Sequence, residues 1–391
     1  MIYEQAEALL AEVFAPLTTD EFFGAIGKAC LESKDGPAHP RRHLFGDDPK
    51  QTILDAFATH VSTLDSHATA PIGPPPAATS VLSQDEFHNF IKSFHQQGYT
   101  VRVPDVVPLA PKLQLFVRAL ECMLRQPVNA SVFWSAAGAQ AIIHYDRPHN
   151  LIIQLEGRKR WFISTEPAGL QNQWAQIGEP PPNLQQHRVL DVEPGDLIYI
   201  PGGTPHTVES TTESLHLAIV FPPVTVREAI IAAVDFLSDN DRSLRETAVG
   251  RVQGADFQTL SNRVIDGLSR VLTHCRSEDF LKAAMDLRSS RVTADLPALD
   301  KPSALAAVTR ETKVQQSPLA ISELRQSFTS LDFSQPGARI AIHAGVEPEL
   351  RFITSTQSFR VADIPGASGD DVKIALVKRL IETGFLEIVH A

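Results

Sequence analysis

Residues 144–161 read HYDRPHNLIIQLEGRKRW. In an extended strand the side chains alternate between two faces, so His144 and Asp146 point to the same side. An imidazole and a carboxylate on one face supply two of the three ligands in the facial triad that binds non-haem Fe(II). This stretch therefore predicts a metal site that needs one more histidine from elsewhere in the chain.

Residues 193–208, EPGDLIYIPGGTPHTV, supply a candidate for that ligand in His206. A His-x-Asp pair alone occurs by chance in many chains, where the histidine is an ordinary core or surface residue. The order of His-x-Asp, Gly-x-Lys-x-Trp, Pro-Gly-Asp and Pro-x-His is far more specific. It makes His144, Asp146 and His206 the predicted metal ligands and catalytic centre, and it leaves His149 and His187 outside the ligand set.

This order of motifs resembles the JmjC branch of the cupin superfamily, the 2-oxoglutarate oxygenases, and within it the ribosomal-oxygenase group. The resemblance covers residues 80–225 well and the C-terminal third in outline. It implies an α+β protein with a double-stranded β-helix (jelly-roll) core and a helical dimerisation region. The pattern of apolar residues adds N-terminal helices, and a helix, strands and a short β-ribbon near the C-terminus suggest a winged-helix-like domain. The implied boundaries are 1–225 for the catalytic domain with its helices, 226–300 for the helical region and 301–391 for the last domain.

The resemblance also assigns residues to the co-substrate. In the family, a basic residue fifteen positions after the first metal histidine binds the distal carboxylate of 2-oxoglutarate, and here that residue is Lys159. Spacing alone would favour a solvated Arg-Lys-Arg run, but the resemblance places Lys159 inside the barrel, with Arg158 and Arg160 facing outward. Ser131 and His216 are the other expected cofactor-binding residues, the latter because residues 214–219 resemble the family's Ser-x-His-Leu-Thr-Ile strand.

Three positions depart from the family pattern. Ser131 and Phe133 stand where the family has Asn-x-Tyr, and Ala218 stands where it has threonine. These differences motivate an alternative, a non-catalytic metal-binding cupin module that acts as a sensor or scaffold. A third interpretation, a metal-dependent isomerase or dioxygenase of another cupin class, would need no anchor such as Lys159.

Two polar residues share the strand parity of His144 and Asp146. Asn150 and Gln154 could orient the metal ligands or contact substrate, as groups behind a metal site often do. Satisfied hydrogen bonds in the barrel interior are the equally good alternative for both.

The resemblance implies an Fe(II)- and 2-oxoglutarate-dependent oxygenase that uses O2 to hydroxylate an amino-acid side chain. The expected substrate is a protein or peptide, such as a ribosomal protein. The segment around 256–274 carries an apolar helical stripe and occupies the position of the family's dimerisation module, so we expect a homodimer. The stripe consists of Phe257, Leu260, Val264, Leu268, Val271 and Leu272.

The amino-acid composition indicates which general class of protein this is. The chain has 391 residues, of which 43% are hydrophobic and 21% charged, as expected for a soluble globular protein of two or three domains. The three cysteines are too far apart for a metal knuckle or a disulfide framework. Without a leader sequence or an apolar run of ~18 residues, the sequence predicts a cytoplasmic protein with no membrane span.

The net charge of −11 argues against a protein that grips nucleic acid through its phosphates. It would help to attract a basic polypeptide substrate, although simple solubility explains it equally well.

The spacing of apolar residues and the positions of glycine and proline predict the secondary structure in outline. Short strands with Gly/Pro turns over 128–221 predict the jelly roll. Helices are expected at 20–31, 111–124, 226–238, 256–274 and 277–288, and a strand at 350–353. The irregular stretch 166–189 is either part of the substrate entrance or an ordinary surface loop.

Overall fold

The computed structural model describes residues 3–60, 62–69, 71–76, 83–166, 183–250, 252–292, 305–326, 330–335 and 338–389. The chain forms two compact units. One contains residues 2–124 and 128–223, and the other contains residues 125–127 and 224–391.

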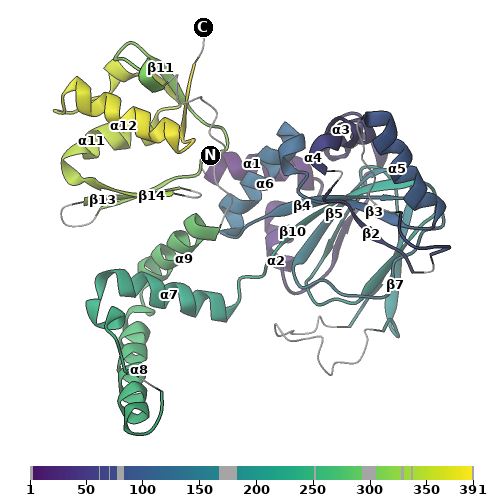
Figure 1. Ribbon diagram of the computed structural model, residues 1–391, viewed down its shortest axis with the longest axis horizontal. Coiled ribbons are helices and arrows are strands. Elements are labelled where there is room, and N and C mark those ends of the chain that lie inside the picture. The colour runs from purple at the N-terminus through teal and green to yellow at the C-terminus, as the bar shows by residue number, and fades with distance from the viewer. Residues whose placement is uncertain are drawn as a thin grey trace. The chain divides into compact units, whose positions relative to one another are not determined.

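The first unit is built on two antiparallel sheets (Figure 1). The larger sheet has the strand order β1-β8-β5-β10-β4-β3-β2, and the smaller sheet has the order β7-β6-β9. The strands are β1 (Leu31–Ser33), β2 (Asp65–His67), β3 (Thr100–Val103), β4 (Asn129–Ser135), β5 (His149–Glu156), β6 (Lys159–Ser164), β7 (His187–Val192), β8 (Leu197–Ile200), β9 (His206–Ser210) and β10 (Ser214–Phe221).

The two sheets pack face to face, which is the jelly-roll arrangement predicted for residues 128–221. Apolar side chains of β5 and β8 in the larger sheet pack against those of β6 and β7 in the smaller sheet. These are Ile152, Trp161, Ile163, Leu190, Val192, Ile198 and Ile200. Because strand residues alternate, the inward face of β6 that carries Trp161 and Ile163 also carries Lys159. Polar residues, including Ser135 and Ser210, line a cavity beside this apolar cluster.

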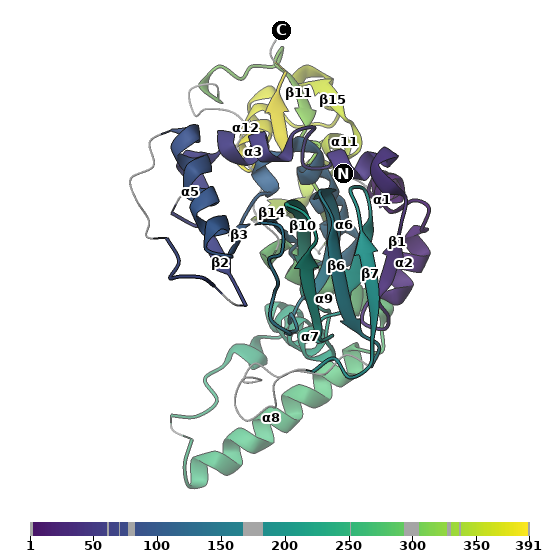
Figure 2. The same cartoon turned by 90° about the vertical axis from the view of Figure 1, so that its right-hand side faces the viewer.

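Helices cover the outer face of the larger sheet (Figure 2). The ring of Phe22 contacts Tyr199 of β8 with centroids 5.5 Å apart, and His95 contacts Trp134 of β4 at 5.8 Å. The helices of this unit are α1 (Tyr3–Phe14), α2 (Thr19–Ala25), α3 (Pro49–Asp55), α4 (Phe57–His60), α5 (Gln84–Gln96) and α6 (Pro111–Leu124), with short 3-10 turns η1 (Gly36–Ala38), η2 (Pro40–His43) and η3 (Val107–Leu109).

The predicted helix at 20–31 is wrong in its second half. Helix α2 ends at Ala25, and Gly27 then adopts a positive φ of 71° that a continuing helix cannot contain. Leu31–Ser33 instead pairs with β8 as the edge strand β1. The apolar spacing of these residues is compatible with either structure, and pairing to a distant strand decides between them.

The second unit begins with α7 (Val226–Asn240), η4 (Arg242–Arg245), α8 (Ala255–His274) and α9 (Glu278–Val292). Two three-stranded sheets follow, β15-β11-β16 and β12-β13-β14. Their elements are β11 (Lys313–Gln316), β12 (Glu323–Gln326), β13 (Ser330–Gln335), β14 (Ala338–His343), η5 (Ala344–Val346), α11 (Glu347–Ser355), β15 (Ser358–Arg360), η6 (Val361–Asp363), α12 (Asp370–Glu382) and β16 (Leu386–Ile388).

The strand predicted at 350–353 is wrong, because these residues lie in α11. Pro348 stands in the first turn, and Leu350 and Ile353 are both fully buried at helical spacing. The division of the C-terminal half into a helical region and a winged-helix-like domain stays a prediction.

Two further observations concern the described residues as a whole. None of the helices among them combines the length and the apolar character needed to cross a bilayer. All three cysteines are free. Residues 167–182, the centre of the stretch proposed to shape a substrate entrance, lie outside the described residues.

Candidate metal centre

The two metal-site histidines meet through their backbones. The N–H of His144 donates to the carbonyl of His206 at 3.0 Å, and the N–H of His206 donates to the carbonyl of His144 at 2.7 Å. This single antiparallel bridge joins the segment after β4 to the start of β9 and holds the two imidazole centroids 4.4 Å apart. Residues 62 positions apart in sequence are thus fixed as neighbours.

The Pro-Gly-Gly turn places the carboxylate ligand. The N–H of Gly203 donates to the carbonyl of Asp146 at 2.7 Å. A Cβ on Gly202 would lie only 2.3 Å from the carbonyl oxygen of Arg147, so this close approach requires glycine. The N–H of Gly202 also donates to Nδ1 of His149 at 3.1 Å. His149 therefore supports the turn.

His144, Asp146 and His206 form a compact ligand set, with one ligand atom from each lying within 4.8 Å of the others. Nε2 of His206 lies 3.6 Å from Oδ2 of Asp146. Nδ1 of His144 donates to the carbonyl of Ile142 at 2.9 Å, and Nδ1 of His206 donates to that of Thr204 at 2.9 Å. Since a carbonyl only accepts, both neutral rings keep the proton on Nδ1 and offer the Nε2 lone pair to a metal.

Electrostatics favour the same state. Burial, and then the neighbouring His144, lower the pKa of His206 below its ordinary value, so this ring is neutral and able to ligate. Two imidazoles and one carboxylate with open positions are the donor set typical of non-haem Fe(II) sites. The residues present therefore fit such an ion.

Asn150 stands behind the carboxylate. Its Nδ2 donates to Oδ2 of Asp146 at 3.2 Å, while its buried Oδ1 has no hydrogen-bond partner within the described part of the chain. Asn150 thus orients a ligand and leaves one acceptor in the cavity. Gln154 behaves differently, because its Nε2 donates to the carbonyls of Glu156 and Gly157 and it is not among the residues that line the cavity.

Lys159 is the second chemical feature of the cavity. Its side chain is 2% exposed, whereas Arg158 and Arg160 on the same strand are exposed, as strand alternation predicted. Its Nζ donates to Oγ of Ser135 at 2.9 Å, and no carboxylate pairs with it among the described residues. Burial lowers the pKa of Lys159 to about 7. An ammonium without a counter-ion in a buried cavity is a binding site for an anion.

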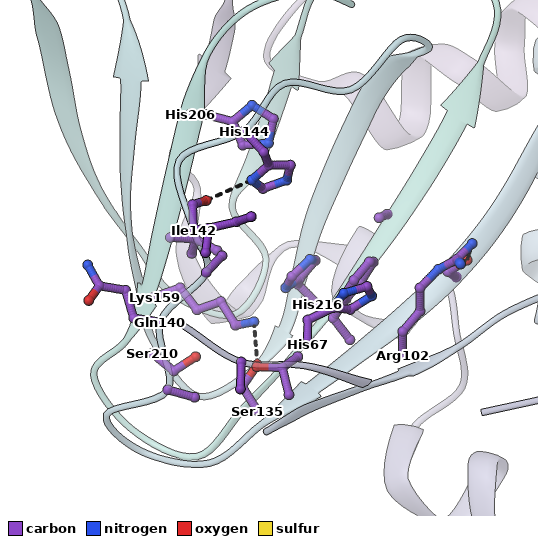
Figure 3. Close-up of a pocket in the computed structure, with 18 of the residues that line it drawn as sticks. His67, Arg102, Ser135, Gln140, Ile142, His144, Lys159, His206, Ser210 and His216 are labelled. Atoms are coloured by element: carbon purple, nitrogen blue, oxygen red, sulfur yellow. Dashed lines mark hydrogen bonds between the residues drawn. The ribbon is translucent and has the colours of Figure 1, made fainter. Parts of the chain in front are cut away.

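The cavity has a tiered organisation (Figure 3). At its base, Lys159 of β6 and Ser210 of β9 face Ser135 of β4. In the middle tier, Trp161 meets His216 with centroids 5.5 Å apart. The metal ligands form the tier beyond. The strand registers therefore place the cation and the metal site on the same wall of one cavity of about 700 Å³.

The middle tier carries two polar atoms without a partner. Nε1 of Trp161 and Nδ1 of His216 are buried and have no hydrogen-bond partner within the described ranges. Burial, and then the charge of Lys159, hold the pKa of His216 well below its ordinary value, so it is neutral. Phe133 stacks on His216 at 4.9 Å with an interplanar angle of 8°.

Ser131 lines the cavity, and its role in binding the co-substrate stays a prediction. Its Oγ accepts hydrogen bonds from Nε of Arg102 at 3.2 Å and from Nη2 at 3.1 Å. The sequence analysis missed Arg102 and Ser135, which both line the cavity. Ser135 could have been found from its parity with Ser131 and Phe133, but Arg102 could not, because nothing local reveals that β3 pairs with β4.

Comparison with known proteins gives the site a context. Residues 109–229 match the family described as the JmjC domain. Ribosomal oxygenase 2 of Rattus norvegicus is 32% identical over 146 residues, which are 36% of this chain and 31% of that protein. The bifunctional lysine-specific demethylase and histidyl-hydroxylase NO66 of Aedes aegypti is 25% identical over 269 residues, which are 61% of this chain and 40% of that protein. The chain thus matches less than half the length of these curated relatives.

Solved structures agree on the fold. The structure of YcfD, a ribosomal oxygenase from Escherichia coli in complex with cobalt and 2-oxoglutarate, superposes with a TM-score of 0.54 at 17% identity. The alignment covers 96% of this chain and 99% of that one. A second structure of the E. coli protein gives a TM-score of 0.56 at 16% identity, covering 95% and 98% of the two chains.

Proposed function

We propose, from the match of residues 109–229 to the JmjC domain and from the similarity to ribosomal oxygenases, that this chain is an Fe(II)- and 2-oxoglutarate-dependent oxygenase that hydroxylates an amino-acid side chain of a protein or peptide. His144, Asp146 and His206 would hold the iron. Lys159 and Ser135 would hold the distal carboxylate of 2-oxoglutarate, and His216 and Trp161 would line its path between the two ends.

One observation carries this proposal: a three-ligand metal site and a buried lysine without a counter-ion share one cavity. A metal-binding module or an isomerase needs the ligands but has no use for the ammonium. A dicarboxylate that chelates the metal at one end and pairs with Lys159 at the other uses both. The charge-assisted hydrogen bonds at Lys159 would repay the cost of burying its charge.

When bound, Fe(II) and 2-oxoglutarate would activate O2 for the oxidation of a C–H bond. The chain's own residues would support this reaction in three ways. The histidine Nδ1 hydrogen bonds to backbone carbonyls keep both rings in the ligating tautomer, and Asn150 holds Asp146 in place. The apolar cluster that includes Trp161 and Ile163 packs beside the cavity and excludes water from that side.

Relatives support the substrate class. The names of the similar proteins include a ribosomal oxygenase, a histidyl-hydroxylase and a lysine-specific demethylase, which all act on protein. We extend only this common feature to the present chain, and a ribosomal protein is the first candidate.

The test is turnover. Purified protein with Fe(II), ascorbate, O2 and 2-oxoglutarate should form succinate, and ribosomal proteins added to the reaction should raise the rate and gain 16 Da, the mass of one oxygen atom. His144→Ala should abolish succinate formation while its circular dichroism spectrum stays unchanged. Metal binding without any 2-oxoglutarate binding would instead support the non-catalytic module, which the loss of polar groups at Ser131, Phe133 and Ala218 motivates.

Helix α8 supports the homodimer. Five of its large apolar side chains are 47–67% exposed, while Val271 alone of the predicted stripe is buried against α7. The exposed ones are Phe257, Val264, Ile265, Leu268 and Leu272. An apolar face of this kind is unusual on a monomer. We propose that a second copy covers it, and sedimentation of Leu268→Glu with Ile265→Glu should then show a monomer. The cytoplasmic location and the winged-helix-like domain stay predictions.

A further inference from the structure

The cavity is larger than the proposed co-substrate needs, and its outer part carries a positive charge. Arg102 lies on β3, three strands from β5 in the larger sheet, and it lines the cavity together with Ser66, His67 and Tyr99. Figure 3 shows Arg102 well apart from Lys159, on the far side of His67 and His216. Because Lys159 and the metal ligands occupy the opposite wall, this outer part is the space that remains for a substrate.

The charges that line the cavity are unbalanced. Among the described lining residues, Lys159 and Arg102 are cationic, and the only carboxylate is the metal ligand Asp146. In the loaded site, the charges of Fe(II) and Lys159 are offset by Asp146 and the two carboxylates of 2-oxoglutarate. Among the described residues that line the cavity, this leaves the charge of Arg102 with no carboxylate of the lining to offset it.

Arg102 is held in place by Ser131, and its ion pair with Asp65 is exposed. Its Nε and Nη2 share the single acceptor Oγ of Ser131, which leaves donors of the guanidinium free for a ligand. Asp65 lies at the rim, 3.7 Å from Nη1 of Arg102 and 3.3 Å from Nε2 of His67, and its side chain is 50% exposed. An exposed pair at such a distance contributes little, so it does not prevent Arg102 from binding an anion.

We propose that Arg102 is a specificity-determining residue that binds a carboxylate of the substrate, so that the cavity accepts a segment with an acidic side chain beside the oxidised position. This inference rests on the proposed function, since it assigns the substrate class of the same site. A lysine or arginine of a substrate would meet Arg102 with no lining carboxylate to receive it, and the pairing of charges would be lost. The overall negative charge of the chain acts at long range, so it does not alter the preference for an acidic side chain at the contact with Arg102.

The experiment compares three pools of acetylated and amidated heptapeptides whose fourth residue is Glu, Gln or Lys and whose other positions are mixed. Immobilised full-length protein, loaded with Mn(II) and 2-oxoglutarate so that it does not turn over, captures peptides that are counted by mass spectrometry. The wild-type protein should prefer the Glu pool over the Gln pool by about tenfold, the size of one charge-assisted contact.

Three variants control the measurement. Arg102→Gln should remove the preference for Glu, and Arg102→Lys should keep part of it because the charge remains. Asp65→Asn removes the rim carboxylate and should increase the preference. If the rim instead selects basic segments, the Lys pool is preferred and Asp65→Asn removes that preference, which would overturn the proposal.

The 2-oxoglutarate retained on the resin is measured in every sample, so that two failures can be told apart. No retention by the wild-type protein contradicts the proposed function. Retention with equal capture of all pools, or with no capture, contradicts the inference alone. Loss of 2-oxoglutarate from Arg102→Gln would place Arg102 in the co-substrate site and would also overturn it.

Discussion

Replacing Lys159 by methionine should stabilise the unliganded protein and abolish its binding of 2-oxoglutarate. Burial lowers the pKa of Lys159 from 10.5 to about 7, so the folded protein binds this proton less tightly than the unfolded chain. At about 1.36 kcal/mol per pKa unit, the cost to folding is on the order of 5 kcal/mol. Methionine has a similar length and no charge, but it leaves Oγ of Ser135 without its donor, at a cost of about 1–3 kcal/mol.

The net expectation is a gain in the free energy of unfolding of roughly 2–4 kcal/mol at neutral pH. The sign of its pH dependence follows from the lowered pKa. The cost of the buried ammonium is fully present below pH 7 and disappears as the pH rises toward 10.5, so the advantage of Lys159→Met should shrink over that interval. Urea unfolding at several pH values measures it.

The matched control is Arg160→Met on the same strand, which removes an exposed ion pair with Asp191. It should change the stability by less than about 1 kcal/mol and leave the binding of 2-oxoglutarate intact. Calorimetric titration of 2-oxoglutarate into the metal-loaded protein gives the second readout, where Lys159→Met should show no binding. A variant that is less stable than wild type, or one that still binds 2-oxoglutarate, would refute the description of Lys159 as an unpaired cation that serves as an anchor.

Three more predictions follow from the same geometry. Asn150→Ala removes the hydrogen bond to Asp146 and should weaken metal affinity by about tenfold in a competition titration, with the fold unchanged. Gly202→Ala should destabilise the protein by about 1–3 kcal/mol and lower metal affinity, because its Cβ meets backbone, whereas Gly24→Ala, whose Cβ meets nothing within 4 Å, should do neither. Since 2-oxoglutarate binds the charged form of Lys159, its affinity should be constant below about pH 7 and fall by up to about tenfold per pH unit above it, as calorimetry can measure.

The metal centre could be predicted from the sequence because its information is local. The predicted strand through His144 and Asp146 is wrong, because His144 forms only an isolated bridge and Asp146 lies between that bridge and β5. The two side chains nevertheless lie close together. Strand parity does place Lys159 with Trp161 on β6. The Pro-Gly-Gly turn before His206 could be recognised as a motif, but the sequence does not explain why the turn requires glycine. Only the structure shows that Gly202 must be glycine because the turn packs against the backbone beside Asp146.

The features that were missed depend on pairing between distant segments. Arg102 reaches the cavity because β3 pairs with β4, and Leu31–Ser33 forms a strand because β8 offers an edge. The strand predicted at Leu350–Ile353 is a different kind of error, because a spacing of three fits one face of a helix and not one face of a strand. The first-turn Pro348 is a second local signal for the helix that was not used. The periodicity of the local sequence does not determine that β3 pairs with β4 or that β1 pairs with β8.

The most direct test of the central claim is an anaerobic titration of 2-oxoglutarate into the Fe(II)-loaded protein, followed by visible absorption. Bidentate chelation of Fe(II) by the keto acid gives a charge-transfer band. We predict a band that saturates at low 2-oxoglutarate concentration and is lost in Lys159→Ala. The absence of a band while Fe(II) is bound to His144, Asp146 and His206 would contradict the assignment and leave a metal-binding module.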